Sequence, residues 1–129
     1  MRLGAIKKVT ENIFAFNEAH GWIKQAPSDL AKSIVIEASE LLEHFQWDES
    51  DRRIKGIQPK NWNEITAEVA DIYWYLITFC KNSKIDLAEA VESKIIKLEE
   101  KYPAKMFNGK HNDEFYKAQK KSYREGRKY

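Results

Sequence analysis

Four acidic residues stand in two pairs whose spacing could serve metal chemistry. Glu37 and Glu40 lie in "IEASELLEHFQW", and Glu68 and Asp71 lie in "EVADIYWYL". Residues three apart share one face of a helix, so each pair forms an acidic ridge. In both segments the ridge runs beside apolar residues that are expected to be buried. The pattern therefore predicts carboxylates at the border of the core.

The two segments are joined by a short connection, which favours antiparallel packing and would bring all four carboxylates to one pocket. At about 4 Å and an effective dielectric constant near 20, each contact between like charges costs about 4 kcal/mol. Such a pocket must take up protons or bind cations. Carboxylate oxygens are hard ligands, so the predicted cations are Mg²⁺ or Mn²⁺.

Two other interpretations of these acids stay open on spacing alone. Either pair by itself is typical of a solvated helix face in a chain in which 33% of residues are charged. A di-iron bundle would need Glu-x-x-His on two helices. The third residue after Glu40 is Glu43, and His44 comes one position too late for that motif.

Helical periodicity accounts for nearly the whole chain, and no segment has the alternation of a strand. Start and stop signals delimit the helices: Pro27 with Asp29, Asn61 with Glu64 and Asp86 with Glu89 at starts, and Gly21 and Pro103 at ends. Residues 48–60 are predicted to be a loop. The predicted helices cover about residues 6–19, 27–47, 62–82, 87–102 and, as a short piece, 113–122.

These elements predict an all-α fold, most simply a four-helix bundle. The length of 129 residues indicates a single domain over residues 1–129. We expect the bundle to span about residues 4–103 and a basic, partly helical C-terminal tail to span about 104–129. The segment 72–80 is apolar on nearly every side, which predicts a helix in the middle of the bundle.

Composition narrows the class of function. The 22 basic and 20 acidic residues leave a net charge of +2, so no overall field favours nucleic acid, although the tail "KAQKKSYREGRKY" interleaves basic residues with tyrosine. The single cysteine, Cys80, has no partner for an intramolecular disulfide. We expect a cytoplasmic protein without a membrane span.

Three ordered blocks resemble the all-α nucleoside triphosphate pyrophosphohydrolases of the MazG type. The first two are the acidic segments, with 27 residues between Glu40 and Glu68, and they resemble the ExxE…ExxD signature of that family. The third is "IDLAEAVESKIIKLEEKYP". The resemblance covers about residues 20–110 and includes the dCTP pyrophosphatase branch.

The resemblance implies Mg²⁺-dependent hydrolysis of a nucleoside triphosphate to a monophosphate and pyrophosphate, with Mn²⁺ as a possible substitute. By resemblance the metal ligands are Glu37, Glu40, Glu68 and Asp71. Glu37 or Glu40 would also position the attacking water as a catalytic residue, and the sequence does not separate these two roles.

Four further residues are candidates for substrate binding. Lys94 matches a family lysine and could contact phosphate. Tyr75 continues the acidic ridge of its helix. Trp47 and Trp62 flank the predicted loop, where a ring could stack on a base or simply fix the loop. The other two tryptophans, Trp22 and Trp74, are assigned to packing.

The predicted function is housecleaning of the (deoxy)nucleotide pool, with pyrimidine deoxynucleoside triphosphates as first candidates. The chain departs from cytidine-type relatives at Gln25, Ala26 and Leu98, so its base preference stays open. Phosphoribosyl-ATP pyrophosphohydrolase activity, from the same fold superfamily, is a less favoured alternative for the function of this chain. The rival of another class is a non-catalytic helical interaction or regulatory module. Apolar surface and the resemblance together predict a homodimer or homotetramer.

Overall fold

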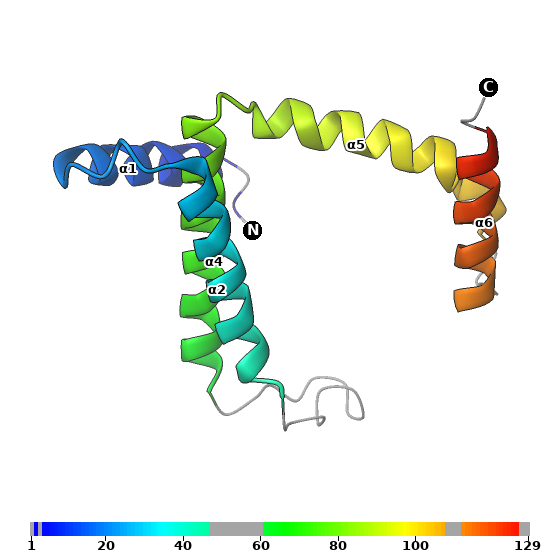
Figure 1. The fold of residues 1–129 in the computed structure, drawn as a ribbon, viewed down its shortest axis with the longest axis horizontal. Helices are drawn as coiled ribbons and strands as arrows, with labels where there is room; N and C mark the ends of the chain where they lie inside the picture. The colour runs from blue at the N-terminus through cyan, green and yellow to red at the C-terminus, as the bar shows by residue number, and fades with distance from the viewer. Residues whose placement is uncertain (1, 3, 47–60, 108–111, 127–129) are drawn as a thin grey trace. The chain divides into compact units, whose positions relative to one another are not determined.

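A computed structural model describes residues 2, 4–46, 61–107 and 112–126 of the chain. The described residues contain no strand, which confirms the all-α fold class (Figure 1). The predicted loop at residues 48–60 lies outside the described ranges. The α-helices are α1 (Ala5–Ala19), α2 (Pro27–Glu43), α4 (Trp62–Asn82), α5 (Leu87–Lys101) and α6 (Asp113–Gly126), with a 3₁₀ turn η1 (Ala104–Met106) between the last two.

The chain divides into two compact units, residues 1–85 and 86–129. The first unit holds α1, α2 and α4, and the second holds α5, η1 and α6. That residues 1–129 form one domain, with a bundle over 4–103, stays a prediction. None of the helices in the described part of the chain is long and apolar enough to cross a membrane.

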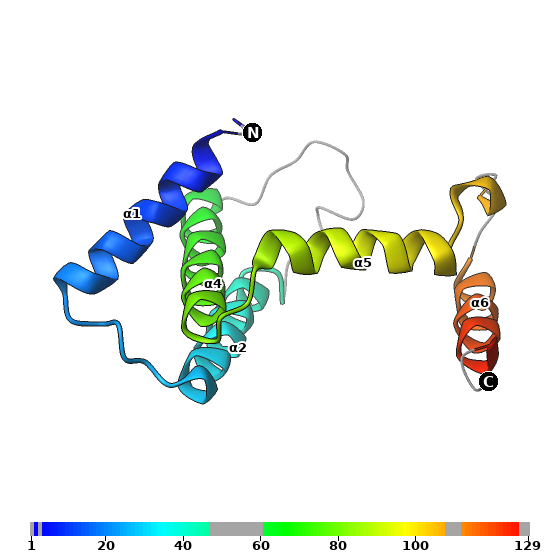
Figure 2. The same cartoon turned by 90° about the horizontal axis from the view of Figure 1, so that it is seen from above.

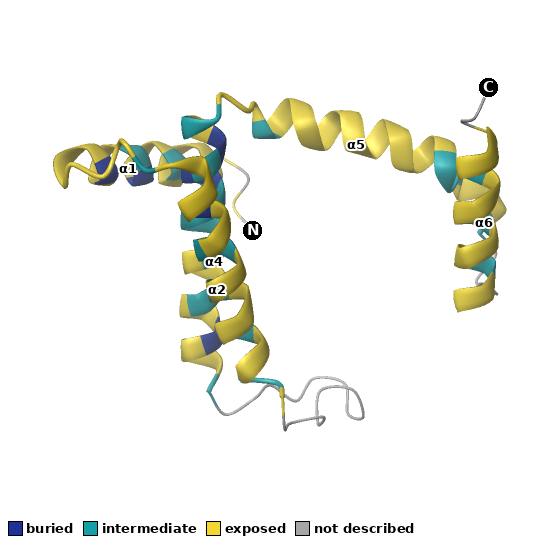
Figure 3. Cartoon of the chain, viewed as in Figure 1, coloured by how far each residue is buried: buried dark blue, intermediate teal, exposed yellow. Residues whose placement is uncertain are grey.

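In the first unit, α2 and α4 lie side by side and antiparallel, and α1 packs across α4 (Figures 1 and 2). All three helices contribute to the small core, which appears as the dark blue positions of Figure 3. The antiparallel pairing predicted from the short connection is therefore correct. The buried apolar residues are Ile13, Leu30, Ile65, Ile77 and Cys80.

A buried polar network joins α1 to α4. The Asn17 side chain is 4% exposed; its Nδ2 donates to Thr78 Oγ1 at 3.0 Å, and its Oδ1 accepts from the indole Nε1 of Trp74 at 3.0 Å. Nearer the start of α1, Thr10 Oγ1 and Tyr73 OH form a hydrogen bond of 2.6 Å. Buried polar groups are costly when unpaired, so this network fixes how α1 lies on α4.

The ends of α2 and α4 differ from the sequence predictions in two respects. We expected the second helix to end near Trp47, but α2 ends at Glu43. The amides of Phe45 and Gln46 bond to carbonyls three residues earlier, which tightens the chain into a turn. We also expected Asn61 and Glu64 to form a capping box. Asn61 is the N-cap residue, but its side chain makes no cap bond because its amide contacts His44 instead.

In the second unit, the helix signals are confirmed at the start of α5. The Asp86 carboxylate accepts a hydrogen bond from the backbone N–H of Glu89 at 3.0 Å, and Pro103 follows the end of the helix. The last helix is longer than predicted, extending to Gly126, and carries the i,i+4 ion pair of Lys121 and Glu125 at 3.9 Å.

Aromatic rings between α5 and α6 make edge contacts, among them Tyr102 with Phe107 and Tyr116.

Removing the amide at the centre of the α1–α4 network tests this description. Asn17→Ala leaves the Trp74 indole N–H without its buried acceptor, so we expect the free energy of unfolding to fall by about 1–3 kcal/mol. Chemical denaturation measures it. Asn12→Ala changes an exposed asparagine of the same helix and should alter stability by less than about 0.5 kcal/mol. Equal losses in both variants would show that the network does not hold α1 in place.

Candidate functional site

Three of the four predicted metal ligands meet between α2 and α4. Glu37 and Glu40 come from α2 and Glu68 comes from α4, and one carboxylate oxygen from each lies within 4.8 Å of those of the other two. Glu37 and Glu68 are half-buried, whereas Glu40 is exposed. We call these three residues the carboxylate cluster. It forms because the two acidic ridges face each other across the antiparallel pair.

Burial and the neighbouring negative charges make the ionised form of Glu37 less favourable. The pKa of Glu37 is raised above its ordinary value, first by burial and then by a side-chain hydrogen bond with Glu40. The negative charges of Glu40, Asp71 and Glu68 raise it further. A bound cation would oppose this rise, because an opposite charge nearby favours the ionised carboxylate. Repulsion of this kind favours uptake of a proton or of a cation.

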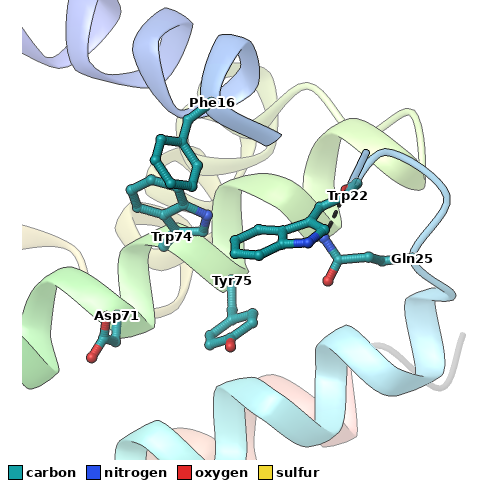
Figure 4. A pocket seen from close by; sticks show the side chains of 6 residues that line it. All are labelled: Phe16, Trp22, Gln25, Asp71, Trp74 and Tyr75. Carbon is teal, nitrogen blue, oxygen red and sulfur yellow. Dashed lines mark hydrogen bonds between the residues drawn. The ribbon is translucent and has the colours of Figure 1, made fainter. Parts of the chain in front are cut away.

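Asp71, the fourth predicted ligand, connects the cluster to a cavity. Its charge acts on Glu37, and its side chain is exposed at the edge of a cavity of about 480 Å³. Figure 4 shows aromatic rings gathered around this space, with the Asp71 carboxylate to one side. The lining residues are Phe16, Trp22, Gln25, Asp71, Trp74 and Tyr75.

The aromatic wall is built from α1, α4 and the segment between α1 and α2. The Phe16 ring lies edge-on to Trp74, with centroids 5.2 Å apart, and tilted to Trp22 at 5.8 Å. Trp22 stands in the segment between α1 and α2, where Gln25 Nε2 donates to the Trp22 carbonyl at 2.8 Å. The Trp74 indole is held by Asn17. The same network that fixes α1 thus also fixes one wall of the cavity.

Sequence reasoning assigned Trp22 and Trp74 to packing, and it missed their place in the cavity. Trp74 packs as predicted, but its ring also faces the cavity. Trp22 is 50% exposed, which is unusual for a residue that serves only the core. The available signal was its position directly after Gly21, whose positive φ of 69° ends α1. A large ring in a short connection is placed to cover a neighbouring surface.

Of the predicted substrate-binding residues, the structure places one in the lining of the cavity. Tyr75 lines the cavity beside Asp71. Trp62 is the first residue of α4, is 44% exposed, and is absent from the described lining of the cavity. Lys94 is exposed on α5 in the second compact unit. Trp47 lies outside the described residues.

Comparison with known proteins identifies the family of the chain. The sequence pattern of the MazG-like family matches residues 32–117, which include the carboxylate cluster, Asp71 and Tyr75. The chain belongs to the MazG-like family. The resemblance found in the sequence is therefore confirmed.

Curated relatives and a solved structure support the same placement. The chain is 31% identical over 84 residues to dCTP pyrophosphatase 1 of Rattus norvegicus, covering 64% of this chain and 49% of that protein. It is 32% identical over 79 residues to dCTP pyrophosphatase 1 of Homo sapiens, covering 60% and 46%. The chain spans about half the length of the curated relatives it matches. A crystal structure of a pyrophosphatase from Archaeoglobus fulgidus matches with a TM-score of 0.68 and 36% identity, over 77% of this chain and 93% of that one.

The raised pKa of Glu37 predicts a pH-dependent stability. A raised native pKa means that the folded state holds the proton more tightly than the unfolded chain, so stability falls as pH rises from the ordinary value of 4.5 through the native pKa. Without divalent ions, Glu37→Gln should therefore be more stable than the unmodified protein near neutral pH, with the difference vanishing below 4.5.

Thermal unfolding in EDTA across this pH range measures the effect. Glu43→Gln removes an exposed charge from the same helix outside the cluster and is the matched control. Adding Mg²⁺ near neutral pH should reverse the order, because only the intact cluster gains from the cation. A Glu37→Gln protein that is less stable than the unmodified protein in EDTA at neutral pH would contradict the assigned repulsion.

Proposed function

We propose that this protein is a Mg²⁺-dependent pyrophosphohydrolase that cleaves (deoxy)nucleoside triphosphates to a monophosphate and pyrophosphate. The observation that carries the proposal is the adjacency of the carboxylate cluster and an aromatic cavity, linked by Asp71. A nucleotide has matching parts, since its phosphates need cations and its base needs a ring surface. The relatives named as pyrophosphatases support this assignment.

The donor set fits a hard divalent cation. Glu37, Glu40 and Glu68 each offer a carboxylate oxygen within one small space, and Asp71 adds a fourth acid nearby. Carboxylate oxygens suit Mg²⁺, with Mn²⁺ as a substitute, whereas zinc favours sulfur and nitrogen ligands. The mutual repulsion that raises the Glu37 pKa gives a cation a direct electrostatic advantage at this place.

The four acids would hold the metal in the proposed reaction, and one of them would also act as a base. Bound Mg²⁺ supplies charge neutralisation at the phosphate oxygens and acidifies a water. Glu40 is the exposed member of the cluster, which favours it for contact with solvent water, and Glu37 is the alternative. The chosen carboxylate positions the water and accepts its proton at an Oε atom.

The cavity would hold the base and sugar. Trp22, Trp74 and Phe16 offer ring faces and edges, and stacking on such rings is worth about 1–3 kcal/mol per base. The Tyr75 hydroxyl is available to a phosphate or to the sugar. Gln25 is the neutral amide in the described lining and could read the edge of a base. Lys94 and Trp47 stay proposed as further phosphate and base contacts.

Pyrimidine deoxynucleoside triphosphates are the first substrates to test, because dCTP pyrophosphatase 1 is a relative. The role would be control of the nucleotide pool in the cytoplasm. A homodimer or homotetramer is part of the proposal, and apolar side chains left exposed in both units support it. These include Val35, Leu42 and Val69 in the first unit and Ile95 and Ile96 in the second, each 53–67% exposed.

Turnover of a nucleotide panel tests the activity. We expect pyrophosphate release from one or more deoxynucleoside triphosphates in Mg²⁺ and none in EDTA. Glu40→Gln removes a ligand and a candidate base, and it should lower kcat/KM by about 10²- to 10⁴-fold. Glu43→Gln, three residues further along α2 and outside the cluster, should retain activity. Absence of turnover on every nucleotide would favour the non-catalytic interaction module instead.

The cavity is tested by removing one ring. Trp22→Ala should raise KM for the preferred triphosphate by about 10- to 100-fold through lost stacking, with kcat changed less. Because Trp22 is 50% exposed, its removal should leave the fold intact, which circular dichroism verifies. Trp62→Ala removes another exposed tryptophan and is the comparison. If KM increases in Trp62→Ala and not in Trp22→Ala, the base binds near Trp62 and not in the cavity, which would contradict this assignment.

A further inference from the structure

His44 lies next to the carboxylate cluster, although no metal-ligand motif includes it. It is the C-cap residue of α2, and its side chain is only 17% exposed. The imidazole Nε2 lies 3.6 Å from Oε1 of Glu68, whose side chain is 18% exposed. The ring therefore borders the half-buried ligand that α4 contributes to the cluster.

Asn61 determines which nitrogen of this ring carries the proton. Its Nδ2 contacts His44 Nδ1. An amide NH₂ group donates and does not accept, so Nδ1 must be the acceptor. The proton of the neutral ring is then on Nε2.

The consequence for the neutral ring is an N–H donor on the side of Glu68. The distance of 3.6 Å is longer than a hydrogen bond, so the contact in this structure is electrostatic. A neutral dipole can orient a carboxylate without cancelling its charge, and the full negative charge stays available to a cation. A lysine or arginine at the same place would compete with the cation. Neighbours of this kind commonly orient metal-binding side chains.

The two residues also join the ends of the two acidic helices. His44 follows the last residue of α2, and Asn61 precedes the first residue of α4. Asn61 forgoes its expected capping bond to make this contact. The side chains therefore link the end of α2 to the start of α4, the two helices that carry the carboxylate cluster.

We propose that His44, held by Asn61 as the Nε2–H tautomer, is a positioning residue that orients Glu68 for cation binding. The proposal rests on the proposed function in taking Glu68 as a metal ligand. It is tested without turnover, so that the two can fail separately.

The tautomer is measured on the unmodified protein by long-range ¹H–¹⁵N correlation of the imidazole nitrogens. The His44 signals are assigned by their loss in His44→Gln, which separates them from those of His20 and His111. We expect the Nε2–H pattern, and a mixture of tautomers in Asn61→Ala. An Nδ1–H or doubly protonated His44 in the unmodified protein would overturn the proposal. The tautomer itself is read from the unmodified protein, and His44→Gln serves only to assign the signals.

Cation binding is measured by titrating the nucleotide-free protein with Mn²⁺ and following water-proton relaxation. His44→Ala should weaken Mn²⁺ binding by about 10- to 100-fold. His44→Gln should recover most of that loss, because its amide nitrogen can supply a neutral donor near the same position. Glu64→Gln is the matched control, since Glu64 lies 4.0 Å from the His44 ring, is 71% exposed and is outside the cluster.

The outcomes separate the two proposals. Unchanged Mn²⁺ affinity in a folded His44→Ala protein overturns the role of His44, whatever the activity. Weakened affinity that His44→Gln restores supports it, even if no nucleotide is hydrolysed and the proposed function fails. No detectable Mn²⁺ binding by the unmodified protein would overturn both. Equal weakening in Glu64→Gln would assign the effect to general charge rather than to orientation of Glu68, and would overturn the proposal.

Discussion

Repulsion among carboxylates on two packed helices is the constraint on which the rest of the site depends. The apolar contact between α2 and α4 brings Glu37, Glu40 and Glu68 within 4.8 Å of one another, although their charges oppose that approach. Burial and neighbouring charges raise the Glu37 pKa as a result. Packing of the two helices thus holds the charges together against their repulsion. A bound proton or cation would reduce that repulsion. The packing of the two helices, rather than a dedicated loop, places these acids together.

The same packing explains how much of this molecule the sequence predicts. Helical spacing places Glu37 with Glu40 and Glu68 with Asp71, and the short connection makes the two helices antiparallel. Both predictions need only local periodicity and one topological rule. The fold class follows from the same pattern. That these four acids act as ligands stays a prediction, since proximity of acids does not by itself show a bound ion.

Where the sequence prediction failed, a contact between distant residues competed with a local signal. Asn61 has the residue type and spacing of a cap, but its amide is used by His44, which is 17 positions away. Sequence rules for helix ends predict the capping bond because they do not include a partner as distant in the chain as His44. Trp22 and Trp74 were assigned to packing for a related reason. A ring that packs on one face can line a cavity with the other, and periodicity reports only burial.

Two sets of polar contacts in the first unit have different tasks. Asn17, Thr78 and Trp74 tie α1 to α4 and hold an aromatic wall in place, while His44 and Asn61 join α2 to α4 beside the acids. Asp71 stands between them, since it lines the cavity and also acts on Glu37. A ligand that touches both the rings and the acids would therefore contact two surfaces that share α4 and are held by different polar contacts. Because α4 carries Glu68, Asp71, Trp74 and Tyr75 within two turns, rotation of that helix would displace both surfaces together. Its fixation from both sides, by α1 and by α2, is thus the structural requirement for a site that recognises a charged group and a ring at once.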